Sequence, residues 1–249
     1  MRALNNFVTR GLTLVLLLIA TALSGAAPSQ RDPAAQIVKS YRAENVPLVD
    51  ALLRLGQQQE VPFGIEYIDL KAVTDPITVA TGAAPVGQVL DAILERAPGY
   101  SWSSRGGVIC ISHSGVPVGG SNLLDHVLSD FSIPKMSMTN AALALDRSLY
   151  MDLHPGTQGW AGSSAGEVSK TEVGPYSLRD VSVREVLNRI VKDADAAWLV
   201  QVPPGNLSRL PSYGLWRTVQ YESPPKLYAP LFRGILLYTK PDQTPDNMR

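Results

Sequence analysis

An amphipathic helix is predicted by residues 45–55, which read NVPLVDALLRL. Leucines at positions 48, 52 and 55 recur at helical spacing, so they line one face of a helix that runs from about residue 47 to residue 59. Asn45 is expected to cap this helix, with Pro47 in its first turn. A helix with one broad apolar face buries that face, so this helix is expected to pack on a sheet.

Strand patterns and a second helix pattern surround this segment. The expected strands cover residues 37–43, 61–68, 76–81, 100–104 and 108–112, and the second helix covers residues 84–97. Gly106 and Gly107 separate the last two strands and allow the positive φ angles of a tight turn. Residues 37–113 therefore predict a small α+β module of βαββαββ type, with two helices packed on a small mixed sheet.

The same succession of patterns returns after a segment rich in Gly, Ser and Pro. Residues 114–127 are predicted to be a linker, and residues 128–221 a second, divergent module. Its first helix, from about residue 137 to 150, is matched to the opening of the first module, and its second helix ends near Lys192. A hairpin is expected from residues 196–202 and 215–221. The sequence leaves open whether the two modules share one sheet, and residues 222–249 predict an irregular tail.

A family resemblance rests on the order of these segments. The helix at 45–55 is followed by a strand around residues 63–67, a helix at 85–94, and a hairpin with a Tyr-x-Trp pattern at residues 100–102. This succession resembles the secretin and TonB N-terminal short domain, and residues 181–200 resemble its second half. The resemblance implies a periplasmic αβ module used for recognition, which contacts assembly partners in secretins and signals to an anti-sigma partner in TonB-dependent transducers.

The first 26 residues have the layout of a secretory signal peptide. Arg2 and Arg10 precede an apolar run at residues 11–23, and small residues follow, which predicts cleavage after Ala26. The run is shorter than the roughly 20 residues that a membrane-spanning helix needs, although an uncleaved anchor helix is the alternative. We therefore expect a periplasmic or secreted protein with no integral membrane span in the mature chain, beginning with an extended leader over residues 27–36.

Composition excludes several classes of protein. The 22 basic and 22 acidic residues balance, so the sequence lacks the positive charge expected of a nucleic-acid-binding protein. The hydrophobic fraction of 45% and the charged fraction of 18% are typical of a folded chain. One cysteine rules out an intramolecular disulfide, and no cofactor is expected.

One catalytic motif occurs, in an unfavourable context. Residues 162–166 fit G-x-S-x-G, the turn that carries the nucleophilic serine of hydrolases, here Ser164. No helix pattern follows it, and the last histidine, His154, precedes the serine, so a Gly/Ser loop is favoured. Paired carboxylates such as Glu167 and Glu172 are the alternative catalytic groups of the hydrolase hypothesis. We predict that the protein is not an enzyme.

Histidine could supply a metal site only with nearby carboxylates. The sequence has His113, His126 and His154, and the last two follow Asp125 and Asp152 closely. Neither spacing is a recognised ligand motif, so solvated loops are favoured and no metal is predicted.

The cysteine and the tryptophans are assigned by their neighbours. Cys110 lies within an apolar strand pattern and is interpreted as an inert core residue. Trp102 and Trp198 follow the second helix of each module and are expected in the core, whereas Trp160 and Trp216 lie near loops and are the candidate contacts for a ligand or partner.

These observations predict an exported, non-catalytic interaction module that docks another cell-envelope protein. An exposed sheet edge, or the loops at residues 156–175 and 203–214, would form the docking surface. The alternative is a periplasmic glycan- or peptide-binding protein that uses Trp160 and Trp216.

Overall fold

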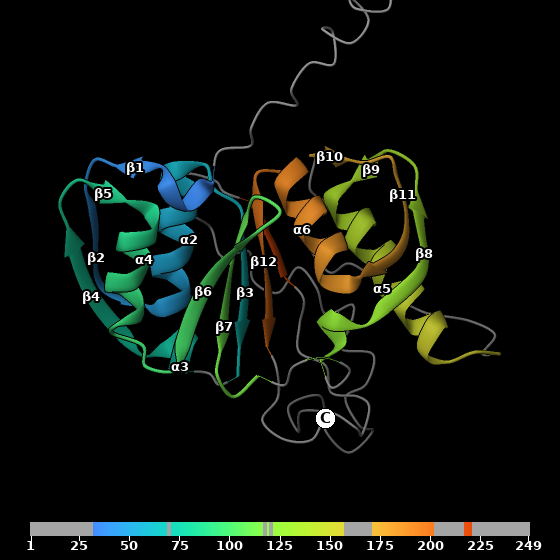
Figure 1. Cartoon of the computed structure of the whole chain (residues 1–249), viewed down its shortest axis with the longest axis horizontal. Coiled ribbons are helices and arrows are strands. Elements are labelled where there is room, and N and C mark those ends of the chain that lie inside the picture. Colours follow the sequence, from blue (N-terminus) through green and yellow to red (C-terminus); the bar gives the residue numbers. More distant parts are fainter. Residues whose placement is uncertain are drawn as a thin grey trace, which may run out of the picture. The chain divides into compact units, whose positions relative to one another are not determined.

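A five-stranded mixed sheet joins the two halves of the chain (Figure 1). The computed structural model describes residues 32–68, 71–116, 119, 122–156, 171–201 and 217–220. The strands, in sheet order, are β13 (Arg217–Gln220), β12 (Ala196–Gln201), β3 (Phe63–Tyr67), β7 (Val108–His113) and β6 (Tyr100–Arg105). β12 and β7 run parallel to β3, and the two outer strands are antiparallel to their neighbours. Both predicted modules therefore contribute strands to one sheet.

Helices α2 (Leu48–Gln59) and α4 (Val86–Leu94) cover one face of this sheet. Their other side packs on the antiparallel pair β2 (Tyr41–Pro47) and β4 (Pro76–Thr81), which Figure 1 shows beyond the helices. Shorter elements complete this half: η1 (Pro33–Ala35), β1 (Ile37–Val38), α3 (Lys71–Thr74) and β5 (Ala84–Pro85). The sheet contributes alternate residues to this core, among them Phe63 and Ile65 of β3.

Helices α5 (Met138–Leu153) and α6 (Val183–Asp193) lie on the opposite side of the sheet (Figure 1). The antiparallel pair β8 (Val127–Ile133) and β11 (Tyr176–Ser182) packs beyond them. The remaining elements are η3 (Leu123–Asp125), β9 (Met136–Ser137) and β10 (Glu172–Val173). Here the sheet contributes the other alternating set, including Cys110 and Trp198. The α+β class predicted from the sequence is confirmed.

The start of α2 differs from the prediction. Asn45 does not cap the helix: Pro47 stands at the N-cap, and no side chain bonds there. Asn45 instead adopts a φ of 50° in a bulge of β2, where its backbone N–H donates to the Thr78 hydroxyl over 3.1 Å. Asparagine tolerates the left-handed region better than most residues, so it suits the bulge as well as a cap.

Other element boundaries shift where short strands intervene. The predicted strand at 37–43 is divided into β1 and β2. The predicted helix at 84–97 begins only at Val86, because the two preceding residues pair with β1, and it ends at Leu94. The predicted helix at 137–150 continues to Leu153, and the hydroxyl of Ser137 accepts from the Asn140 N–H at its start.

An internal repeat appears in the backbone conformation. The four non-glycine residues with positive φ among the described residues form two pairs, Asn45 with Asp180 and Glu60 with Asp195. In each pair the first residue stands 135 positions before the second. Strand pairing repeats at the same interval, since Tyr41 of β2 and Tyr176 of β11 hold equivalent places in their two-stranded sheets. Residues 37–66 therefore correspond to residues 172–201.

The other part of the repeat has a different position in the chain. The segment β4–β5–α4 corresponds to β8–β9–α5, because Ala84 of β5 and Met136 of β9 occupy the same place against β1 and β10. This segment follows β3 in the first half of the chain but precedes β10 in the second half. The sequence match of helix 137–150 to the opening of the first module is therefore wrong. α6 repeats α2, and α5 repeats α4.

Several predicted segments lie outside the described residues. These are the signal peptide at 1–26, the first half of the leader at 27–36, much of the two loops, and the tail at 222–249. Within the leader, Asp32 caps the short helix η1 through its carboxylate. No helix in the described ranges has both the length and the apolar character required to cross a bilayer.

Candidate functional site

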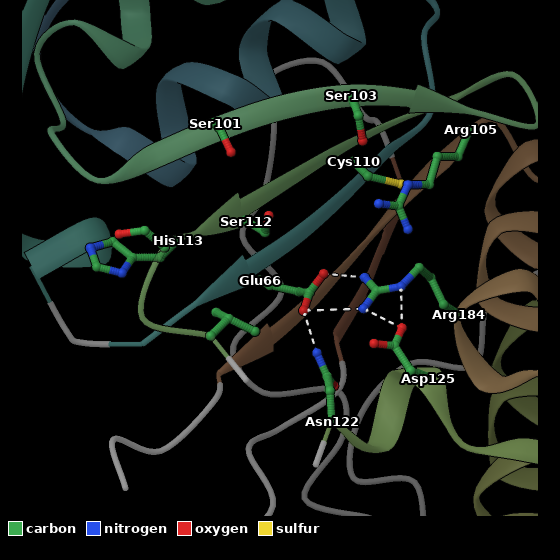
Figure 2. Close-up of a pocket in the computed structure, with 12 residues that line it drawn as sticks. Glu66, Ser101, Ser103, Arg105, Cys110, Ser112, His113, Asn122, Asp125 and Arg184 are labelled. Atoms are coloured by element: carbon green, nitrogen blue, oxygen red, sulfur yellow. Dashed lines mark hydrogen bonds and ion pairs between the residues drawn. The ribbon is translucent and has the colours of Figure 1, made fainter. Parts of the chain in front are cut away.

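A polar pocket of about 210 Å³ opens on the sheet face that carries α6 (Figure 2). α6 packs over β12 and β3, and the pocket lies beside it over β7 and β6. Strand alternation brings Ser101, Ser103 and Arg105 of β6 and Cys110 and Ser112 of β7 to this face. The serine row, Ser101, Ser103 and Ser112, gives the pocket a small, polar lining.

An ion-pair cluster closes one side of the pocket. Arg184 of α6 pairs with Glu66 of β3, and its Nε and Nη2 atoms donate to Asp125 Oδ1 over 3.1 and 2.9 Å. Asn122 Nδ2 donates to Glu66 Oε2 over 3.0 Å. Figure 2 shows the four side chains converging from β3, α6 and η3 and its flank. The cluster therefore ties together three elements that are distant in the sequence.

Glu66 and Arg184 are the buried pair of this cluster, in which two carboxylates face one guanidinium. Glu66 is 2% exposed, and the Arg184 side chain is 9% exposed. Burial acts to lower the pKa of Arg184, but the bonds and charges of Glu66 and Asp125 outweigh burial and hold that pKa above its usual value. Arg184 therefore stays charged and is committed to two carboxylates, so it offers little charge to a ligand.

Beside the cluster, Trp198 fills the space over β3. Its indole N–H donates to Asn188 Oδ1 over 2.8 Å, and its ring is fully buried. The ring lies directly on Gly64, where an added Cβ would stand 2.2 Å from two ring atoms. Glycine is required at position 64 because any side chain would occupy the space of the indole. The prediction that Trp198 is a core residue is confirmed.

Cys110 forms part of the pocket floor, next to Asn188. Burial raises the pKa of the Cys110 thiol, although Asn188 and two arginines act in the opposite direction. A raised pKa keeps the thiol protonated at neutral pH, and a protonated thiol is a poor nucleophile. The described geometry thus agrees with the interpretation of Cys110 as a buried residue of the core.

Native Cys110 is expected to resist thiol reagents at pH 8. Reaction with Ellman's reagent should be on the order of 100-fold slower in buffer than in guanidinium chloride, because the sulfur must first be exposed by local opening. Equal rates in both solvents would show that the thiol is already accessible. The raised pKa of the Cys110 thiol also favours the folded state below the ordinary pKa of a thiol, so the free energy of unfolding should fall as pH rises through the alkaline range. A Cys110→Ser chain provides the blank.

The structure pairs the histidines differently from their sequence neighbours. His126 Nε2 lies 2.6 Å from Asp152 Oδ2, a contact that neither sequence pair anticipated. His154 stacks on Tyr150, and His113 accepts the Gly115 N–H at Nδ1. No group of three potential ligands is placed to hold a metal ion within the ranges that the structure describes.

Other sequence candidates fall outside the described residues. Trp160 and Trp216, the predicted ligand or partner contacts, lie there, as do residues 162–166 and Glu167. Glu172 is described, and it pairs with Lys135 over 2.8 Å on the surface. Trp102 is partly buried against the α2–α4 core, and its indole N–H donates to Asp91 over 2.8 Å.

The ion-pair cluster was missed by sequence reasoning, yet the repeat contains a signal for it. Arg184 and Asn188 occupy the positions that correspond to Val49 and Leu53 of α2, which are buried apolar residues. Two polar residues inside an otherwise apolar helix face indicate a polar partner on the opposing sheet. Glu66, within the apolar strand β3, is the partner of Arg184, and the Trp198 indole N–H of β12 is the partner of Asn188.

A two-residue turn connects the edge strand β6 to β7. Gly106 and Gly107 have φ angles of 61° and 85°, as a type I′ turn requires. Such a turn makes Arg105 and Val108 the first hydrogen-bonded pair of the hairpin. Every second residue of β6 then bonds to β7 in the same way.

This alternation determines which backbone groups of β6 face outward. Ser103 and Ser101 are bonded to β7, so the N–H and C=O groups of Trp102 and Ser104 point away from it. Among the described strands, only β7 pairs with β6. Within the described ranges, the sheet therefore ends in an edge whose outward donors and acceptors have no strand partner, directly beside the polar pocket.

Comparison with models of protein families, with curated proteins and with solved structures finds no match to this chain.

Proposed function

We propose that this chain is an exported, non-catalytic interaction module that docks an extended segment of another cell-envelope protein. The segment would add to the sheet as a strand beside β6. The observation that carries the proposal is the outward-facing backbone of Trp102 and Ser104 at the end of the sheet. Recognition is also what the resemblance to the secretin and TonB N-terminal short domain implies, and export rests on the signal-peptide pattern of residues 1–26.

Strand addition suits this edge because it needs no catalytic group. Main-chain hydrogen bonds supply much of the affinity, and the alternate side chains of the added strand meet pockets that supply specificity. At β6 the pocket face presents Ser101, Ser103 and Arg105, which leave room for side chains of the partner.

The edge is also held in place before any partner arrives. β7 is buried through Ile111, and Trp102 is fixed on the opposite face by its bond to Asp91. A backbone that is already extended and supported loses little conformational entropy on binding. This support favours β6 as a docking edge over a loop.

Proline at position 104 is expected to remove docking while leaving the fold intact. Ser104→Pro deletes an outward N–H and places a ring where the partner backbone would lie, but it spares the bonds between β6 and β7. Capture of the partner from envelope extract by the mature chain should fall at least roughly tenfold, the effect of losing about 1.4 kcal/mol. Quantitative mass spectrometry of the captured proteins measures the change.

Ser104→Ala is the matched control, because it removes the same hydroxyl and keeps the N–H. The proposal requires one protein that the unsubstituted chain and Ser104→Ala retain and that Ser104→Pro loses, with similar thermal unfolding for all three. Equal recovery of that protein by Ser104→Pro would place docking elsewhere. Recovery of no specific protein by the unsubstituted chain would contradict an interaction module.

A further inference from the structure

The charges around the pocket are unevenly satisfied. Arg184 is paired with two carboxylates, those of Glu66 and Asp125, whose oxygens also accept from Asn122 and from the Gly119 N–H. Arg105 also lines the pocket, but it forms no ion pair with any residue in the described part of the chain. Among the described residues that line the pocket, Arg105 is thus the arginine available to a ligand.

A second cation lies at the same end of β6. Lys192 of α6 donates from Nζ to the Gly106 carbonyl oxygen over 3.2 Å, one residue beyond Arg105. This lysine likewise has no ion-pair partner among the described residues. The hairpin end of the docking edge therefore carries two positive charges, whereas Ser101 and Ser103 along the rest of the edge are neutral.

We infer that the segment docked on β6 is acidic and presents a carboxylate to Arg105. The inference rests on the proposed docking at this edge and adds the chemistry of the partner. Side chains directly opposite in adjacent strands lie about 5 Å apart at Cβ, so a residue of the added strand comes within reach of Arg105. An opposite charge there is favourable, and a like charge is unfavourable.

Strand alternation gives the segment a pattern. Residues of the added strand that share the pocket face are spaced two apart, and they lie opposite Ser101, Ser103 and Arg105 in turn. The expected segment therefore has an aspartate or glutamate at one end of this set, followed at every second position by two side chains that suit the serines. The acidic residue comes first or last according to the direction of the added strand.

Selection from a random nonapeptide library tests the inference without knowing the natural partner. Peptides displayed on phage are selected on the mature full chain, and the selected sequences are compared with those from Arg105→Glu and Ser104→Pro chains. The expected result is enrichment of aspartate or glutamate on the unsubstituted chain and of lysine or arginine on Arg105→Glu. Lys39→Glu reverses a charge between β1 and β2 and should keep the acidic preference.

A binding measurement with one selected peptide sharpens the test. Arg105→Gln should weaken the acidic peptide up to about fivefold, and changing its carboxylate to an amide should have no further effect on that variant. The acidic partner would be overturned, and edge docking kept, by peptides of the following kind. They lose binding to Ser104→Pro, lack acidic residues, and bind Arg105→Glu as well as the unsubstituted chain. Peptides that bind Ser104→Pro equally well would instead overturn the proposed edge, and no enrichment at all would contradict both.

Discussion

Arg184→Met is expected to lower the free energy of unfolding by about 3–5 kcal/mol, the usual result of breaking a buried ion pair from one side. Methionine leaves the Glu66 carboxylate buried without its cation, and it removes both bonds to Asp125. The loss also removes the ion pair that links α6 to β3, so it affects both halves of the molecule. Urea denaturation followed by circular dichroism measures the change.

Arg189→Met is the matched control for this variant. Arg189 lies on the same helix but is exposed, so its replacement should change stability by no more than about 0.5 kcal/mol. Adding Glu66→Gln to Arg184→Met should restore part of the loss, because the unpaired charge is then removed. If Arg184→Met costs no more than Arg189→Met, the cluster does not stabilise the fold.

Gly64→Ala is expected to destabilise the protein by about 3 kcal/mol, although it adds a single methyl group. The new Cβ would overlap the buried Trp198 ring, and β3 cannot move away because it is paired on both sides. Thermal unfolding of the variant reports the loss. Gly82→Ala adds the same methyl group where nothing lies within 4 Å, and it should be close to neutral.

A second substitution separates overlap from other causes. Trp198→Phe in the Gly64→Ala background should recover part of the stability, because the smaller ring frees space over residue 64. No recovery, together with equal stability of the Gly64→Ala and Gly82→Ala chains, would show that the indole does not enforce glycine.

The local elements were largely predictable from sequence, because apolar spacing reports secondary structure directly. The residues that form the stripe of α2 lie within a short segment, and so do the two glycines of the β6–β7 turn. The bulge at Asn45 was not predictable in this way, since asparagine is common both at helix caps and in left-handed conformations. Sequence pattern did not distinguish the two.

The site and the order of the repeat depend on contacts between residues that are distant in the sequence. Glu66 and Arg184 are far apart in sequence, and a periodic pattern says which face is buried but not what covers it. α5 and α6 both carry apolar residues at helical spacing, so spacing alone did not show that α6 repeats α2. The backbone angles at Asp180 and Asp195 reveal that relation, and they are properties of the folded chain.

The parallel contact between β3 and β12 has a consequence for how the chain is made. During synthesis β3 emerges long before β12. The β3 edge that pairs with β12, and the surface of Gly64 that Trp198 covers, therefore stay exposed while the intervening elements are produced. Parallel pairing across such a sequence distance forms slowly and leaves nascent chains prone to aggregation. The interval before β12 is complete is therefore the stage of synthesis at which this chain is most exposed to aggregation.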